Sequence, residues 1–310
     1  MPSKEAAFFN EMFANMPKTP EGQPHDFAEE RRGDRNRPKA NEYSDVTISE
    51  YTLAGIHGEL LTPQGNEARK GQLLWYIHGG GFTTGAASER REITTYLCHT
   101  YGFTVAANDY RLAPEHHWPA ALDDCLSYYR SLLDEGWDPA QMVFMGESAG
   151  GTLVLSLALK LKELEMPGPK AIAAFSPCVN QAEGYPSHRN NAKTDVMLGD
   201  AVGRSDQNEA VWGSPSPDLM MLRDPLISPV YGDWFGLPPV FLAASDVEAL
   251  RDDAVEMYQK LKSEGYRTML DIQHDVFHAY PMLPVVPEAR DTIEKAVRFI
   301  DETDVPGRMG

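Results

Sequence analysis

The feature that most constrains the fold is the alternation of short apolar strands with helical stretches from about residue 102 onward. The expected strands are GFTVAANDY, MVFMGES, AIAAFSP, PPVFLAASD and TMLDIQHDV. Helical stretches lie between or after them, at about 120–135, 149–164, 250–264 and 288–302. Such alternation is typical of a mostly parallel, twisted sheet covered by helices on both faces. We therefore expect an α/β fold, in which ligands bind at the carboxyl ends of the strands.

The first half of the chain extends this sheet. The runs DVTISEYTLAG and HGELLTP are close enough to form a hairpin, and GQLLWYIHG supplies a further strand. We therefore expect the main domain over residues 45–310, preceded by a separate segment, residues 1–44. That segment opens with an amphipathic helix whose apolar face should cover the core or a cleft, because apolar side chains recur at helical spacing: Phe8, Phe9, Met12, Phe13 and Met16.

An insertion at about 184–238 breaks the alternation. It is rich in Pro, Gly, Asp and Asn, and short helices are expected at 195–203 and 206–212. The apolar residues Met197, Leu198 and Trp212 favour a packed lid over a loose loop. We expect residues 1–44 and this insertion to form a helical cap on the main domain.

The charge balance excludes several classes of partner. The chain of 310 residues carries 28 Lys and Arg against 46 Asp and Glu, a net charge of −18. Such a surface repels phosphate groups, so neither nucleic acid nor an anionic membrane is an expected partner. The basic cluster RRGDRNRPK, residues 31–39, is predicted to be a solvated linker rather than a binding patch.

The cysteines and the N-terminus favour a cytoplasmic location. The scattered Cys98, Cys125 and Cys178 do not suggest a disulfide framework and are predicted to be buried thiols in a reducing compartment. The N-terminal sequence has no basic start followed by an apolar run, so it does not read as a signal peptide. No stretch approaches the roughly 18 apolar residues that a membrane span requires.

A nucleophilic serine is indicated at residues 142–151, MVFMGESAGG. Here a strand ends in G-x-S-x-G and continues into a helix, the pattern of a nucleophile elbow. Gly146 and Gly150 remove side chains that would clash across the sharp turn, which leaves the Ser148 hydroxyl projecting. A phosphate-binding loop would need Lys after its second glycine, and this sequence has none there.

Serine needs a base, and three of the nine histidines are candidates: His78, His274 and His278. The chain order nucleophile, acid, histidine selects the last two. The spacing in HDVFH also fits zinc on a helix, but a strand precedes it and Pro281 follows, so zinc is not expected. His278 is better placed at the strand end, whereas His274 is predicted to be structural and His78 to brace its own loop.

The acid that orients the histidine has more than one candidate. Asp224 precedes the strand PPVFLAASD and so falls on the lid side of the sheet. Asp246 and Glu248 both follow that strand, at the edge where the nucleophile and the base are expected. The residues alone leave these two open.

Four motifs resemble the hormone-sensitive-lipase-like carboxylesterases, the bacterial family IV esterases of the α/β-hydrolase fold. They are HGGG at 78–81, DYRLAPE at 109–115, GESAGG at 146–151 and the ending FHAYPMLPVVPEAR, and the resemblance runs from about residue 45 to the C-terminus. Laid without gaps on LPPVFLAASDVEALRDDA, the family pattern puts the triad acid at Glu248. The chain departs from that pattern, since Glu replaces Asp and Ala249 replaces Pro.

The oxyanion of the tetrahedral intermediate needs backbone N–H donors. Ala149 follows the nucleophile directly and supplies one, and the resemblance assigns the others to Gly80 and Gly81. Asp109 and Arg111 of DYRLAPE are expected to brace the elbow loop, and Glu147 to be structural.

The sequence thus predicts a serine carboxylesterase that uses Ser148, His278 and Glu248 on a small-molecule ester with short to medium acyl chains. No cofactor or metal is expected. Lactone or amide hydrolysis would use the same groups. A binding protein on this fold is a weaker alternative, because related receptors lack the catalytic histidine. The resemblance also implies a possible homodimer through the edge strand.

Overall fold

The computed structural model describes residues 1–19, 23, 25–35, 43–65, 69, 71–199 and 201–303, with backbone alone for 33–35. Its described part contains an eight-stranded sheet in the order β1-β2-β4-β3-β5-β6-β7-β8. The strands are β1 Val46–Glu50, β2 Gly58–Pro63, β3 Leu73–Ile77, β4 Thr104–Asn108, β5 Met142–Glu147, β6 Ala171–Phe175, β7 Val240–Ser245 and β8 Thr268–Gln273. The predicted β1–β2 hairpin is confirmed, and all neighbours from β4 to β8 pair in parallel.

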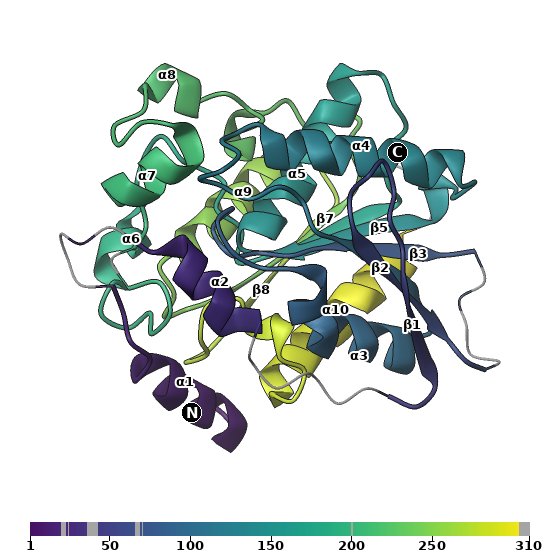
Figure 1. The fold of residues 1–310 in the computed structure, drawn as a ribbon, viewed down its shortest axis with the longest axis horizontal. Coiled ribbons are helices and arrows are strands. Elements are labelled where there is room, and N and C mark those ends of the chain that lie inside the picture. Colours follow the sequence, from purple (N-terminus) through teal and green to yellow (C-terminus); the bar gives the residue numbers. More distant parts are fainter. Residues whose placement is uncertain are drawn as a thin grey trace.

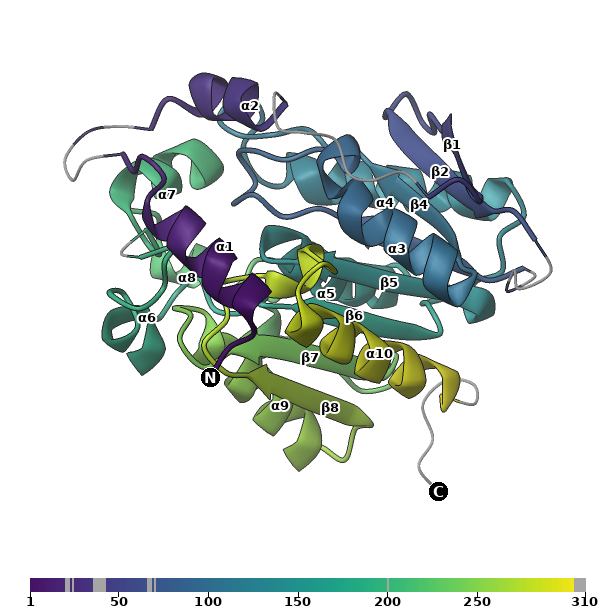
Figure 2. The same ribbon diagram turned by 90° about the horizontal axis from the view of Figure 1, so that it is seen from below.

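Helices cover both faces of the sheet, as Figures 1 and 2 show. One layer holds α4 Ala120–Asp134, α5 Ala149–Glu163 and α9 Arg251–Ser263, and the other holds α3 Arg91–Tyr101 and α10 Pro287–Asp301. Strand β3 shows why: Trp75 and Ile77 enter the first core, whereas Leu74 and Tyr76 enter the second. Because both faces are buried, the strand is apolar throughout. The predicted α/β-hydrolase architecture is confirmed.

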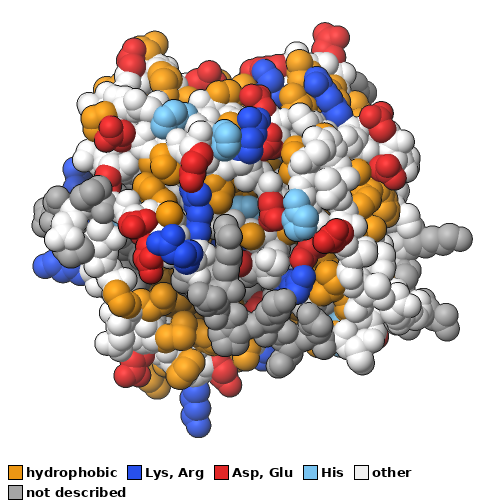
Figure 3. Space-filling view, viewed as in Figure 1, with side chains coloured by type: hydrophobic (Ala, Val, Ile, Leu, Met, Phe, Trp, Pro, Cys, Tyr) orange, Lys and Arg blue, Asp and Glu red, His pale blue; other side chains and the backbone are white. Residues whose placement is uncertain are grey.

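The N-terminal segment contains α1 Lys4–Ala14 and α2 Phe27–Arg35. The ring centroids of Phe13 and Phe277 lie 5.0 Å apart, so α1 packs on the chain around residues 276–289. The predicted helix is confirmed, and its Phe13 side covers this part of the core. Its apolar residues are not all buried, because Phe8 is 62% exposed and Met12 is 39% exposed. Figure 3 shows hydrophobic side chains gathered over α1 at the lower left.

The described part of the basic cluster at 31–39 does not form the predicted linker. Residues 31–35 belong to α2, and residues 36–39 lie outside the described part. The Arg31 guanidinium donates to the carbonyls of Thr83 and Ala113, at 2.6 and 2.5 Å, and pairs with Glu115. A helix whose Arg31 side chain bonds two backbone carbonyls of the main domain therefore stands in the described part, where a solvated chain was expected.

The insertion holds α6 Pro186–Asn190, the predicted α7 Ser205–Trp212, and α8 Leu219–Leu222. The helix expected at 195–203 does not form, and residues 196–199 make only a turn. The Asp195 side chain accepts hydrogen bonds from the N–H groups of Met197 and Leu198 at 3.0 and 2.8 Å, and Gly199 has φ 55°. Asp195 thus caps the turn, and the left-handed backbone of Gly199 ends it, as glycine commonly ends a helix. Four 3₁₀ turns complete the described elements: η1 Ala87–Arg90, η2 Pro139–Gln141, η3 Pro229–Tyr231 and η4 Tyr280–Met282.

The three cysteines are free thiols. Cys98 and Cys125 are buried as predicted, and Cys178 is half-buried. Burial raises the pKa of the Cys98 thiol to about 12 and raises those of Cys125 and Cys178. Over the residues with described structure, no helix combines the length and apolar character needed to cross a bilayer.

Candidate active site

Ser148 occupies a sharp turn between β5 and α5. Its backbone has φ 54° and ψ −124°, a conformation that is rare for a residue with a side chain. A Cβ at Gly146 would lie 2.6 Å from the Gly150 carbonyl oxygen, and one at Gly150 would lie 2.0 Å from that of Ile77. The turn therefore requires both glycines. The strand, the turn and the helix predicted from MVFMGESAGG are all present.

The HGGG loop begins beside this turn, because Ile77 at the end of β3 pairs with Gly146 of β5. The Gly79 carbonyl accepts a hydrogen bond from His78 Nδ1 at 2.8 Å, and the Gly80 carbonyl accepts those of the Thr83 and Thr84 N–H groups at 3.0 and 2.9 Å. In a trans peptide the following N–H points away from the carbonyl. The Gly80 and Gly81 N–H groups are therefore fixed in direction. Neither these two nor the Ala149 N–H donates to another described residue.

His78 is held inside its own loop. A carbonyl can only accept, so His78 Nδ1 carries the proton that is donated to Gly79. The ring stacks on Tyr110 with centroids 4.2 Å apart, and burial lowers the pKa of the imidazole. A neutral, internally bonded His78 braces the loop. The buried Glu147 carboxylate adds a second brace, since it accepts from the Gly79 N–H and from Arg90 Nε, both at 2.6 Å.

Glu248 and His278 form a buried pair at the carboxyl ends of β7 and β8. Glu248 Oε2 lies 2.8 Å from His278 Nδ1, and Glu248 Oε1 accepts from the Ser245 N–H at 3.1 Å. Glu248 is 0% exposed and His278 is 3% exposed. His278 Nε2 is buried and has no hydrogen-bond partner in the described part of the chain. The ring is therefore oriented through Nδ1, and Nε2 is free to meet a reacting group.

The end of β6 connects this pair to the serine. The Ser148 N–H donates to the Phe175 carbonyl at 2.8 Å, and the Ala279 N–H donates to the Ser176 Oγ at 3.1 Å. Ser148 and the residue that follows His278 thus bond to two consecutive residues, Phe175 and Ser176. The structure brings Ser148, His278 and Glu248 to one edge of the sheet.

Asp246 faces a different histidine. Asp246 Oδ2 lies 2.8 Å from His274 Nδ1, and the His274 side chain is 79% exposed. Both His274 and His278 lie after the end of β8 in a bend and a turn, so HDVFH is not helical. Among the residues that the structure describes, no group of three or more His, Cys, Asp or Glu side chains could hold a metal ion. The two candidate acids therefore have different partners.

The electrostatics of the pair follow from its burial. Burial raises the pKa of Glu248, although the hydrogen bond from His278 opposes this shift. Burial alone would lower the pKa of His278, but the hydrogen bond and the charge of Glu248 outweigh it, so the pKa is raised. A protonated His278 is thus stabilised by the carboxylate. The pair can accept a proton at Nε2 and hold the resulting charge.

The insertion holds the loop that carries Glu248, a role that the sequence did not reveal. Asn191 Nδ2 donates to the carbonyls of Asp246 and Glu248 at 3.0 and 2.8 Å. Asp195 Oδ2 accepts from the Ala249 N–H at 2.7 Å, and Ser187 Oγ donates to the Ala249 carbonyl at 2.6 Å. No motif marks these residues, because a turn-rich insertion carries no signal for its distant partner.

The expected role of DYRLAPE needs correction. Asp109 accepts from the Ala87 N–H and pairs with His57, both at 2.6 Å, and Arg111 pairs with Asp124. Within the described residues, neither side chain hydrogen bonds to residues 146–150. They brace the start of η1 and of α4, because their strand lies on the far side of β3 from β5.

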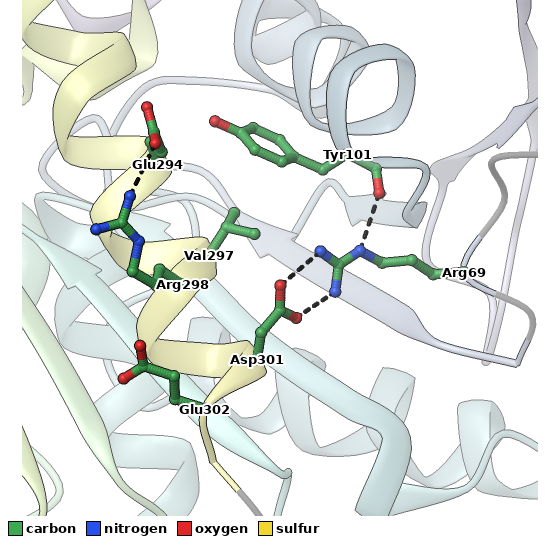
Figure 4. A pocket seen from close by; sticks show the side chains of 7 residues that line it. All are labelled: Arg69, Tyr101, Glu294, Val297, Arg298, Asp301 and Glu302. Carbon is green, nitrogen blue, oxygen red and sulfur yellow. Dashed lines mark hydrogen bonds and ion pairs between the residues drawn. The ribbon is translucent and has the colours of Figure 1, made fainter.

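A pocket of about 400 Å³ lies far from this site, at the opposite edge of the sheet (Figure 4). Its lining includes Arg69, which precedes β3, Tyr101 at the end of α3, and Asp301 at the end of α10. The Arg69 guanidinium forms a bidentate ion pair with Asp301. Because parallel α/β sheets bind ligands at the carboxyl ends of the strands, this pocket is not the candidate site.

Comparisons with known proteins place the chain in a family. The model of the alpha/beta hydrolase fold family matches residues 74–282, more than half of the chain. An acetyl-hydrolase of Streptomyces hygroscopicus is 32% identical over 231 residues, 74% of this chain and 75% of that protein. An esterase of Acinetobacter venetianus is 28% identical over 84% of each chain.

A solved structure gives the same result. An esterase from the bacterial hormone-sensitive lipase family superposes with a TM-score of 0.84 at 28% identity, covering 98% of this chain and 99% of that one. The chain belongs to the alpha/beta hydrolase fold family and is a carboxylic ester hydrolase. Within that fold it groups with the esterases of the hormone-sensitive lipase family, as its motifs predicted.

Proposed function

We propose that the protein hydrolyses small carboxylic esters through a triad of Ser148, His278 and Glu248. The observation that carries the proposal is the buried 2.8 Å contact between Glu248 Oε2 and His278 Nδ1. It leaves Nε2 without a hydrogen-bond partner among the described residues, at the edge of the sheet where the serine turn lies. Asp246 is not the proposed acid, because it pairs with the exposed His274.

The proposed reaction has two steps that use the same groups: acylation of Ser148 and hydrolysis of the acyl-enzyme. Ser148 Oγ attacks the ester carbonyl while His278 Nε2 takes its proton, and Glu248 stabilises the imidazolium. The oxyanion accepts hydrogen bonds from the N–H groups of Gly80, Gly81 and Ala149. His278 then protonates the leaving alcohol, and water repeats the sequence on the acyl-enzyme. Each such proton transfer is typically worth about 10² to 10⁴ in rate.

The surroundings of the HGGG loop support the proposed substrate class. The residue after Gly81 belongs to an aromatic cluster of Phe82, Trp118 and Trp212. The ring centroids of this cluster lie 5.7 to 6.2 Å apart. Apolar walls of this kind suit acyl groups of short to medium length. We also propose that residues 1–44 and about 184–238 act together as the cap. A lactone or an amide would use the same groups, and the cytoplasmic location and the homodimer stay predictions.

The test compares p-nitrophenyl esters from acetate to decanoate with a lactone panel. We expect the highest kcat/KM at acyl chains of two to about six carbons, and loss of hydrolysis in Ser148→Ala while the variant stays folded by circular dichroism. A folded Ser148→Ala that keeps wild-type activity would rule out the proposed nucleophile. A rate that rises up to decanoate would contradict the proposed chain length alone.

A further inference from the structure

We propose that Gln207, on α7 of the proposed cap, is a positioning residue for the oxyanion hole. Its side-chain Nε2 donates to the carbonyl oxygen of Gly81 at 2.6 Å, across 126 positions of sequence. Gly81 supplies one of the N–H groups assigned to the oxyanion, so this inference rests on the proposed function. A cap side chain thus contacts the backbone of the HGGG loop itself.

The backbone of that loop has positive φ at three successive residues. Gly80, Gly81 and Phe82 have φ angles of 113°, 61° and 63°. Positive φ costs little for glycine but is unfavourable for Phe82, and such conformations persist when the surroundings fix them. The peptide between Gly81 and Phe82 joins two of these residues. Its carbonyl is the group that Gln207 holds.

The other carbonyls of the loop are satisfied from within the main domain. The Gly79 carbonyl bonds to His78, and the Gly80 carbonyl bonds to the N–H groups of Thr83 and Thr84. The Gly81 carbonyl instead accepts its hydrogen bond from Gln207 of α7. The bonds to the Gly80 carbonyl hold the peptide on the N-terminal side of Gly81, and Gln207 holds the peptide on its C-terminal side, between Gly81 and Phe82. Without Gln207, Gly81 is held on one side alone, so the position of its N–H becomes less defined.

The surroundings of Gln207 show that α7 docks firmly on this loop. Trp212, five residues further along α7, packs on Phe82 with centroids 6.2 Å apart. The Trp118 N–H donates to the Val211 carbonyl at 2.9 Å, and His117 Nδ1 lies 2.7 Å from the Ala210 carbonyl oxygen. Gln207 is therefore presented to Gly81 by a helix that the main domain already holds.

The N-terminal helix α2 contacts the backbone that directly follows the HGGG loop. Arg31 donates to the Thr83 carbonyl at 2.6 Å. The two cap pieces are joined to each other, because the His25 N–H donates to Asp206 Oδ2 at 3.2 Å and Asp206 precedes Gln207 on α7. Both pieces of the proposed cap thus contact this part of the main domain and each other, with Gln207 as the contact to the oxyanion-binding backbone.

The kinetic signature follows from where the bond acts. Hydrogen bonds to the oxyanion strengthen in the transition state, so a misplaced Gly81 N–H lowers kcat and leaves KM nearly unchanged. Loss of one such positioning hydrogen bond should lower kcat about 3- to 10-fold. A side chain that served acyl binding alone would change KM instead.

The experiment compares Gln207→Met with Glu209→Met, the same substitution at an exposed position of α7. We expect Gln207→Met to lose about 3- to 10-fold in kcat on p-nitrophenyl butyrate, and to lose affinity for a trifluoromethyl ketone, which forms a tetrahedral adduct with serine, by a similar factor. Glu209→Met should retain wild-type values. Gln207→Glu, which keeps the shape but presents an acceptor to the carbonyl at pH 8, should be at least as slow as Gln207→Met.

Two outcomes would overturn the inference: a kcat for Gln207→Met and Gln207→Glu within twofold of Glu209→Met, or a change confined to KM. Ser148→Ala, measured in parallel, separates this failure from that of the proposed function. If Ser148→Ala is inactive and the Gln207 variants are fully active, the triad stands and the role of Gln207 is wrong. If Ser148→Ala remains active, the proposed function itself fails.

Discussion

Replacing Glu248 by Gln removes one of the two hydrogen-bond acceptors that this buried side chain uses. Oε2 faces His278 Nδ1 at 2.8 Å, and Oε1 accepts from the Ser245 N–H at 3.1 Å. An amide offers one oxygen and one NH₂ group. The NH₂ group of Gln must therefore face either the Ser245 N–H or His278 Nδ1. If the NH₂ faces Nδ1, the imidazole takes the tautomer with its proton on Nε2, which cannot accept the serine proton.

The size of the effect follows from burial. Both side chains are almost fully shielded from water, so no solvent replaces the lost carboxylate. Breaking a buried charge pair by removing one partner typically costs about 3 to 5 kcal/mol, and the wrong tautomer in a serine triad costs about 10⁴ in kcat. We expect Glu248→Gln to lower kcat about 10³- to 10⁴-fold. That loss corresponds to about 4 to 5.5 kcal/mol of transition-state stabilisation.

The control is Asp246→Asn, which changes the other carboxylate near β7 in the same way. Its partner His274 is 79% exposed, and exposed pairs contribute about 0 to 1 kcal/mol, so kcat should change less than about threefold. Both variants are assayed with p-nitrophenyl butyrate after their folding is checked by circular dichroism. A crippled Asp246→Asn beside a Glu248→Gln that keeps more than a tenth of wild-type kcat would refute the assignment.

Three further changes test the electrostatics, the serine turn and the N-terminal helix. His278 must be neutral to act as a base and its pKa is raised, so kcat/KM should fall as pH drops, with a midpoint above about 6.5; a midpoint below 6 would contradict this. Gly150→Ala should abolish soluble expression, because its Cβ would lie 2.0 Å from a backbone oxygen of β3, whereas Gly168→Ala makes an ordinary 3.4 Å contact and should express normally. Phe13→Ala should lower the free energy of unfolding in urea by about 3 kcal/mol, since Phe13 is 5% exposed; Phe8→Ala, at a 62% exposed position, should change it by less than about 0.5 kcal/mol, and equal effects would contradict the packing of α1.

The sheet and its helices could be predicted because their signals are local. An apolar strand such as β3 and a helix such as α5 each fit into a window of about fifteen residues or fewer. The serine turn is also local, since Gly146, Ser148 and Gly150 stand in one short stretch. Chain order and family resemblance then indicated His278 and Glu248, and the structure adds that the alternative Asp246 has its own partner.

The contacts of the proposed cap could not be predicted in this way. Asn191 and Asp195 hold the loop of Glu248 from more than fifty residues away, and Gln207 reaches Gly81 across 126 positions. Polar side chains of a turn-rich segment have many possible partners, so composition alone does not choose among them. Where a helix was expected from residue 195, the structure has a turn that Asp195 caps and that Gly199 ends at φ 55°.

The claim that Ser148 is the nucleophile is tested most directly by stoichiometric covalent labelling. Diethyl p-nitrophenyl phosphate transfers its diethylphosphoryl group to an activated serine oxygen and releases p-nitrophenolate. We predict release of one equivalent per chain, a matching mass increase on the peptide that contains Ser148, and parallel loss of esterase activity. Ser148→Ala should show neither release nor labelling. A label on another residue, or equal labelling of Ser148→Ala, would contradict the proposed mechanism.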